Sequence, residues 1–182
     1  IDRIGTWSSL GENSLTELLG IKNYIDGRST LAAAVSAVRS AISQIESLHN
    51  SESLVKKLKG EFCESVPVYG NINRSLFNTD RDPADFVYAA EAAVDQGYSI
   101  IKCAPFDEVY SNDSKETIME NARPGIDRVQ AIRKAVGEKV VILIDCHARF
   151  EEHSAYLVAE ELTKLDIGWF EEPLDPIDEP EK

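Results

Sequence analysis

The spacing of apolar residues changes several times between residue 66 and the end of the chain. Short apolar runs, typical of β-strands, cover residues 66–69, 98–103, 140–144 and 167–170. Between these runs, apolar residues recur three and four positions apart, as they do in amphipathic helices. Strands and helices that alternate in this way predict a parallel sheet, which is either doubly wound or a (β/α) barrel.

Local signals support this alternation and favour the barrel. The helix after the first strand has Asp82 as its predicted cap, Pro83 in its first turn and Gly97 at its end. No glycine-rich phosphate-binding motif follows a strand, which weakens the nucleotide-binding, doubly wound alternative. Four strands cannot close an eight-stranded barrel, so the barrel interpretation predicts that the chain is incomplete.

The first third of the chain has a different pattern. Residues 31–48 carry apolar side chains at helical spacing, which predicts one buried helix face. That face would consist of Leu31, Val35, Val38, Ile42 and Ile45. Residues 1–27 hold short apolar pieces broken by glycines, which is typical of a small α+β segment. We therefore predict that the regular alternation of strands and helices begins near residue 65, after a smaller part of the chain with a different organisation.

Composition and charge exclude some classes of function. The net charge of −13 argues against nucleic acid, because phosphate backbones are bound by an excess of Lys and Arg. No apolar run reaches the roughly 20 residues that span a bilayer, so we expect no membrane partner. Three cysteines without a CxxC pair favour a reduced, cytoplasmic setting. We also expect the protein to form a homo-oligomer.

Polar side chains gather where the predicted strands end. They are Asn71, Asn73 and Arg74 after the first strand, Lys102 at the second, Asp145 and His147 at the third, and Glu171 and Glu172 at the fourth. In a barrel these ends meet at one mouth, and carboxylate oxygens are ligands that suit Mg²⁺. Taken singly, Asp145 could be only a helix cap, Lys102 a surface lysine and Glu171 the start of a solvated loop. Their joint occurrence on consecutive strands favours a site.

Three segments resemble the mandelate racemase-like branch of the enolase superfamily. They are GYSIIK at 97–102, LIDCHARF at 143–150 and WFEEPL at 169–174. The resemblance covers roughly residues 28–182. It implies a partial N-terminal capping domain over residues 1–64 and the first half of a (β/α) barrel over residues 65–182. It implies that Asp145 and Glu171 bind Mg²⁺, with a third acidic ligand beyond Lys182.

The resemblance also implies catalytic roles. Lys102 matches the first lysine of the KxK pair on the second strand, whereas Ala104 stands where the second lysine usually acts as a base. His147 matches the histidine that serves as acid or base in sugar-acid dehydratases. Asn73 and Arg74 match positions that contact the substrate in some relatives.

These roles predict a Mg²⁺-dependent lyase that dehydrates a sugar acid through an enediolate. The alternatives are an epimerase, racemase or cycloisomerase on the same scaffold, a Schiff-base aldolase that uses Lys102, and a non-catalytic barrel. Ala104 makes a racemase with two opposed bases less favourable. His147 favours dehydration because an unperturbed imidazole, with a pKa of roughly 6.5, suits proton transfer around neutral pH.

Overall fold

The computed structural model describes residues 29–110, 113–114 and 117–175, and the predicted α+β segment at 1–27 lies outside them. The chain divides into two compact units, Ile1–Val66 and Pro67–Lys182. In the described part of the chain, none of the helices is long and apolar enough to cross a bilayer. The assignment of the first unit to a capping domain stays a prediction.

Among the described residues of the first unit there are one long helix and one short helix. Helix α2 spans Ser29–His49 and buries Val35 and Ile42, as the apolar spacing predicts. Ile45, on the same predicted face, is 62% exposed, so the buried face is shorter than the pattern suggested. Helix α3 covers Leu54–Lys57, and the Ser53 hydroxyl caps it by accepting the Lys56 N–H at 3.2 Å.

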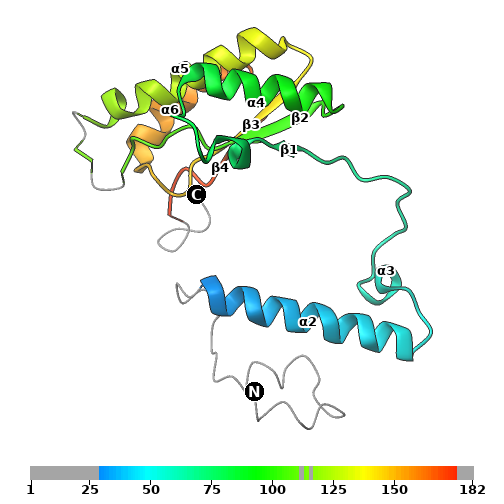
Figure 1. The fold of residues 1–182 in the computed structure, drawn as a ribbon. Helices are drawn as coiled ribbons and strands as arrows, with labels where there is room; N and C mark the ends of the chain where they lie inside the picture. The colour runs from blue at the N-terminus through cyan, green and yellow to red at the C-terminus, as the bar shows by residue number, and fades with distance from the viewer. Residues whose placement is uncertain (1–28, 111–112, 115–116, 176–182) are drawn as a thin grey trace. The chain divides into compact units, whose positions relative to one another are not determined.

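The second unit is a parallel sheet covered by helices on one face (Figure 1). Its elements are β1 (Gly70–Asn71), the 3₁₀-helix η2 (Asn73–Leu76), α4 (Pro83–Asp95), β2 (Ile100–Cys103), α5 (Ile118–Val136), β3 (Val141–Asp145), α6 (Glu152–Thr163) and β4 (Trp169–Glu171). Each strand pairs in parallel with the next one in the chain, in the order β1-β2-β3-β4. A doubly wound sheet reverses its order at a switch point, whereas a barrel does not. The predicted (β/α)-barrel class is confirmed.

The predicted strands of the second unit begin and end within two residues of the observed ones, except for the first strand. Asp82 caps α4 through a capping box with Asp85, and Gly97 follows the helix with φ +94°. The predicted strand at 66–69 is wrong, because the strand is Gly70–Asn71. β2 begins at Ile100, which lies one residue before the partner of Gly70, so the earlier apolar residues extend past the start of the neighbouring strand. Strand propensity without a ladder partner does not make a strand.

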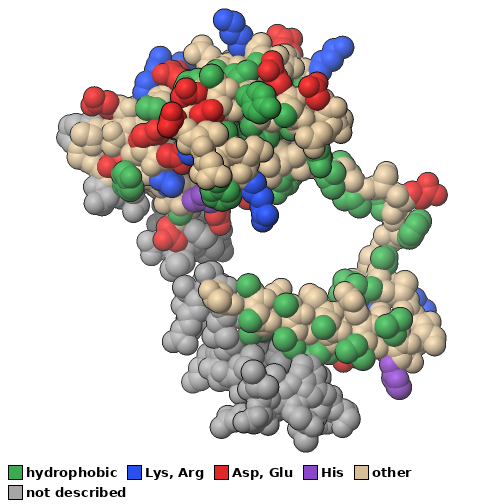
Figure 2. Space-filling model, in the orientation of Figure 1, with side chains coloured by type: hydrophobic (Ala, Val, Ile, Leu, Met, Phe, Trp, Pro, Cys, Tyr) green, Lys and Arg blue, Asp and Glu red, His purple; other side chains and the backbone are tan. Residues whose placement is uncertain are grey.

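The core lies between the sheet and its helices. Register pairs Ile101 with Ile142 and Cys103 with Ile144, and all four are at most 1% exposed. Figure 2 shows many acidic side chains on the visible outer face of this unit, in keeping with the net charge of −13.

Candidate active site

Lys102, Asp145 and Glu171 lie on the face of the sheet opposite the helices. Asp145 and Glu171 are the last residues of β3 and β4 and are register partners. Lys102 is paired with Leu143, two residues below Asp145 on the same face. Its backbone is thus one layer below the carboxylates, and its long side chain reaches up to them.

The Lys102 ammonium joins the two carboxylates. Its Nζ lies 2.9 Å from Asp145 Oδ2 and 2.7 Å from Glu171 Oε1. The lysine side chain is 7% exposed and that of Asp145 is 12% exposed, so solvent screens these contacts weakly. Burial alone lowers the pKa of Lys102, but the hydrogen bonds and charges of Glu171 and Asp145 outweigh it and raise this pKa above its ordinary value.

A strained turn holds His147 beside Asp145. His147 and Ala148 both have a left-handed backbone, with φ of +52° and +55°. The His147 N–H donates to Asp145 Oδ1 at 3.3 Å, and its Nε2 lies 3.3 Å from Asp145 Oδ2. Non-glycine residues in this conformation cost of order 1–3 kcal/mol and cluster at functional sites. The imidazole is 56% exposed and can therefore meet a ligand from solvent.

Backbone hydrogen bonds join the exits of β3 and β4. The N–H groups of Cys146, Ala148 and Phe150 donate to the carbonyls of Glu171, Glu172 and Pro173, at 3.0, 2.7 and 3.0 Å. The turn that carries His147 is thereby fixed to the segment that carries Glu171.

Asn73 and Arg74 are the first two residues of η2. Asn73 Oδ1 accepts the Ala104 N–H at 2.8 Å, so this oxygen fixes the end of β2. Arg74 is exposed. Their assignment to substrate binding stays a prediction.

The residues present have the ligand chemistry of a Mg²⁺ site. Asp145 and Glu171 offer hard carboxylate oxygens that converge on one positive charge, which is the donor chemistry Mg²⁺ prefers. Within the described ranges, no group of three or more His, Cys, Asp and Glu side chains is arranged to hold a metal ion. Two carboxylates make a partial set, and Mg²⁺ commonly completes such a set with water and substrate oxygens.

The sequence interpretation missed two features of the site. Tyr69 lies beside the lysine, with Lys102 Nζ 5.6 Å from its ring centroid, within cation–π range. Alternation places Tyr69 on the same face as Asn71, a signal that the pattern contained. Arginines 81, 128 and 149 bind the loop after β2, and no spacing signal pointed to them.

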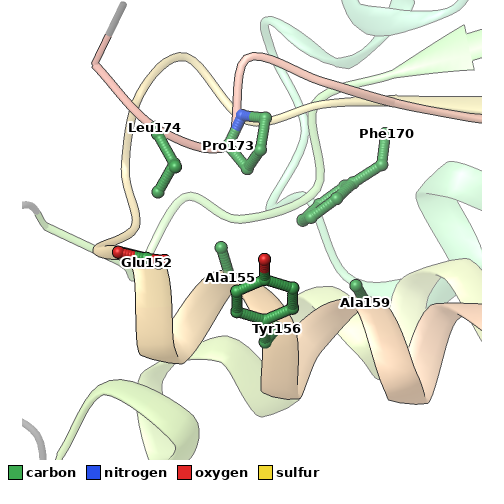
Figure 3. A pocket seen from close by; sticks show the side chains of 7 residues that line it. All are labelled: Glu152, Ala155, Tyr156, Ala159, Phe170, Pro173 and Leu174. Atoms are coloured by element: carbon green, nitrogen blue, oxygen red, sulfur yellow. The ribbon is translucent and has the colours of Figure 1, made fainter. Parts of the chain in front are cut away.

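A hollow of about 490 Å³ lies on the other side of β4 (Figure 3). Phe170, Pro173 and Leu174 line it together with one face of α6, formed by Glu152, Ala155, Tyr156 and Ala159. Since Phe170 and Glu171 point to opposite faces of the strand, the hollow is separate from the carboxylates. In a complete barrel, the next β/α unit packs at this edge.

The fold and the site together are those of the (β/α)-barrel class: the parallel strands follow chain order, and the polar side chains gather at their carboxyl ends. The family model described as enolase C-terminal domain-like matches residues 85–182, more than half of the chain. The chain therefore belongs to the enolase C-terminal domain-like family, and the resemblance stated from the sequence is confirmed.

Curated relatives include sugar-acid dehydratases. A D-gluconate dehydratase of Thermoproteus tenax is 31% identical over 79% of this chain and 27% of its own length. A D-xylonate dehydratase of Haloferax volcanii is 30% identical over 92% of this chain and 42% of its own length. The chain thus spans less than half the length of these relatives.

Other similar proteins extend beyond dehydratases. A 3,6-anhydro-alpha-L-galactonate cycloisomerase of Streptomyces coelicolor is 29% identical over 80% of this chain and 36% of its own length. A solved structure from Labrenzia alexandrii, named for the mandelate racemase/muconate lactonizing enzymes, superposes with a TM-score of 0.66 at 27% identity. The superposition covers 77% of this chain and 36% of the chain in the solved structure.

Proposed function

We propose that this chain supplies half of the active site of a Mg²⁺-dependent enzyme that dehydrates a sugar acid. The observation that carries the proposal is the contact of one buried lysine with two carboxylates from the next two strands. The names of the dehydratase relatives support the choice of reaction. The homo-oligomer and the cytoplasmic location stay predictions beside it.

Each residue has a proposed role. Asp145 and Glu171 would hold Mg²⁺, which would supply positive charge to the substrate carboxylate when an α-proton is removed. Lys102 would bind the same carboxylate through its ammonium, which is strongest in a site with little water. His147 would transfer a proton, because its exposed imidazole beside Asp145 can protonate the β-hydroxyl as it leaves as water. Arg74 would contact the polyhydroxyl part of the substrate, with Asn73 beside it.

The other candidate functions fit the geometry less well. A Schiff-base aldolase needs a neutral lysine amine, whereas two carboxylates stabilise the protonated form of Lys102. A non-catalytic barrel gives no reason to bury this charged cluster. A cycloisomerase is the second candidate, since a cycloisomerase relative covers 80% of this chain.

A substrate screen tests the reaction. The full-length protein with Mg²⁺ should convert at least one sugar acid to a keto acid, measured as its semicarbazone, and EDTA should abolish the product. The control His153→Asn on α6 should leave the yield unchanged, whereas His147→Asn should remove the product. A stereoisomer or rearranged lactone without a keto acid would exclude dehydration in favour of an isomerase.

Calorimetric Mg²⁺ titration tests the ligands. Asp145→Asn and Glu171→Gln should each weaken Mg²⁺ binding by more than about 100-fold, because outer-shell partners alone are worth 10- to 100-fold. Asp166→Asn and Glu138→Gln remove the same charges from the loops before β4 and β3, so they are matched controls. Unchanged Mg²⁺ affinity in both site variants would refute the ligand assignment.

A further inference from the structure

The loop that leaves β2 is irregular but deeply buried. Residues 104–110 form neither helix nor strand, yet Phe106 is 2% exposed and Val109 is fully buried. Backbone groups in such a segment have no ladder partners and must find others. This loop begins two residues after Lys102, so its position bears directly on the proposed site.

Three arginines satisfy the loop's carbonyls. Arg81 donates to the carbonyl of Ala104 at 2.8 Å, and Arg128 donates to that of Pro105 at 2.7 Å. Arg149 donates to the carbonyls of Asp107 and Val109 at 3.2 and 2.7 Å. These arginines come from three different parts of the chain, so they fix the loop from several sides.

Arg128 is the centre of this arrangement. It is 6% exposed, and its guanidinium bonds both carboxylate oxygens of Glu108, at 2.7 and 2.6 Å. Its Nε also donates to the Arg81 carbonyl at 2.7 Å, and Arg81 has a left-handed backbone with φ +57°. A buried guanidinium is costly unless it is fully paired, and this one has both a carboxylate and two carbonyl partners.

Helix α5 is shaped to receive the same loop. A Cβ at Gly125 would overlap the Phe106 ring and would lie 3.0 Å from the Pro105 carbonyl oxygen. Glycine inside a helix costs roughly 0.5–1 kcal/mol relative to alanine, so its presence here matches a need for close approach. α5 thus provides both the cavity for Phe106 and the arginine that holds Pro105.

We propose that Arg128 is a positioning residue for Lys102. Arg128 makes no contact with Lys102 among the described hydrogen bonds and ion pairs, and it acts through the loop. By fixing Pro105 and, through Arg81, Ala104, it holds the end of β2 where the Lys102 side chain meets Asp145 and Glu171. The proposal rests on the proposed function in one respect only, namely that the position of Lys102 affects activity.

Selective acylation of lysines tests the position without assaying activity. In the full-length protein, Lys102 is buried at 6% exposure and should react slowly with acetic anhydride, whereas the exposed Lys139 reacts quickly. Arg128→Met should increase acylation of Lys102 at least several-fold relative to Lys139, with faster hydrogen exchange over 104–110. Arg123→Met, on the same helix but 64% exposed at its side chain, is the matched control and should change neither.

Two further variants keep the test decisive. Arg128→Lys retains the charge but loses the bidentate contact with Glu108. Acylation of Lys102 in this variant should lie between that of the wild type and that of Arg128→Met. If Arg128→Met does not fold, Glu108→Gln removes the partner charge at equal size and should also increase Lys102 acylation. Acylation unchanged in a folded Arg128→Met or Glu108→Gln protein would overturn the proposal, even if exchange in the loop became faster.

Activity and metal binding separate this proposal from the proposed function. Arg128→Met should lower kcat/KM by about 10- to 100-fold, as loss of outer-shell partners does, with Mg²⁺ affinity within twofold of wild type. A wild-type protein without Mg²⁺ binding or keto-acid formation would refute the proposed function. The acylation result would still decide whether Arg128 positions Lys102.

Discussion

The two faces of the sheet use the same strands for different purposes. On the helix-covered face, Ile142 and Ile144 are fully buried, and the side chains are apolar. On the opposite face of β3, Val141 is 41% exposed and Asp145 ends the strand. Alternation along one strand therefore separates residues that hold the fold from residues that are available for chemistry. A substitution on the helix-covered face should therefore affect mainly stability. A substitution on the opposite face should affect mainly activity.

The largest expected effect is on the helix-covered face. Ile142→Ala should lower the free energy of unfolding by about 2–5 kcal/mol, because it leaves a cavity in close-packed surroundings. Val141→Ala, one residue away on the opposite face, is the control and should change it by about 0.5 kcal/mol or less. Chemical denaturation measures both. Equal losses would show that the opposite face is covered as well and would remove the distinction.

Lys102→Met should produce a large effect on the opposite face, in activity. Loss of the charge that binds the substrate should reduce kcat/KM by roughly 10²–10³, as removal of one stabilising donor does elsewhere. Mg²⁺ affinity should be unchanged or improved, because a cation next to the two carboxylates has been removed. Steady-state kinetics and calorimetry measure the two quantities. A variant with wild-type kcat/KM would make Lys102 a structural residue.

A smaller effect is expected from acid on the loop network. Burial alone would raise the pKa of Glu108, but its hydrogen bonds to Arg128 and the charges of Arg128 and Arg81 outweigh this and lower it. Because the folded-state pKa is the lower one, the stabilisation is complete above the unfolded value of about 4.3. This stabilisation is lost as the pH falls through the folded-state pKa of Glu108.

Thermal melts from pH 6 to pH 3 measure this contribution. Glu108→Gln should melt with a shallower pH dependence than wild type over the acid range. Glu91→Gln on α4, at an exposed position, is the control and should leave the slope unchanged. Parallel curves for wild type and Glu108→Gln would contradict the expectation.

The smallest effect concerns the thiols. Burial raises the pKa of Cys103 to about 12, and it also raises that of Cys146 above its ordinary value, so both stay protonated and shielded near neutral pH. Cys63 is exposed, and none of the three is in a disulfide. Of these three thiols, only that of Cys63 should react with Ellman's reagent in the native protein, and all three should react after denaturation. Rapid reaction of all three would show that the helix-covered face opens.

The sequence by itself determined the order of elements and the candidate residues. Period-two and helical spacing, together with signals such as Asp82 and Gly97, located the strands and helices of the second unit within a few residues. The same rules placed Lys102, Asp145 and Glu171 at or next to strand ends, and the structure has them there. These signals are local, so a single sequence carries them.

Only the tertiary structure decided the pairing and the supports. The first strand was misplaced at 66–69 because its start depends on where β2 begins. Gly70 pairs with Ile101, which is 31 positions further along the chain, a separation that local propensity does not sense.

 The contacts among Lys102, Asp145 and Glu171 likewise join separate strands, and only the register brings the lysine one layer below the two acids.

The arginine-bound loop was beyond the sequence for the same reason. Arg128 meets Glu108 and Pro105 across 20 and 23 positions of the chain, and a surface arginine has the same local pattern as a buried one. Its importance comes from desolvation and from the carbonyls that lack other partners, both of which exist only after the helix has packed on the sheet. Local periodicity therefore specified which residues end the strands, and packing specified what holds them in place.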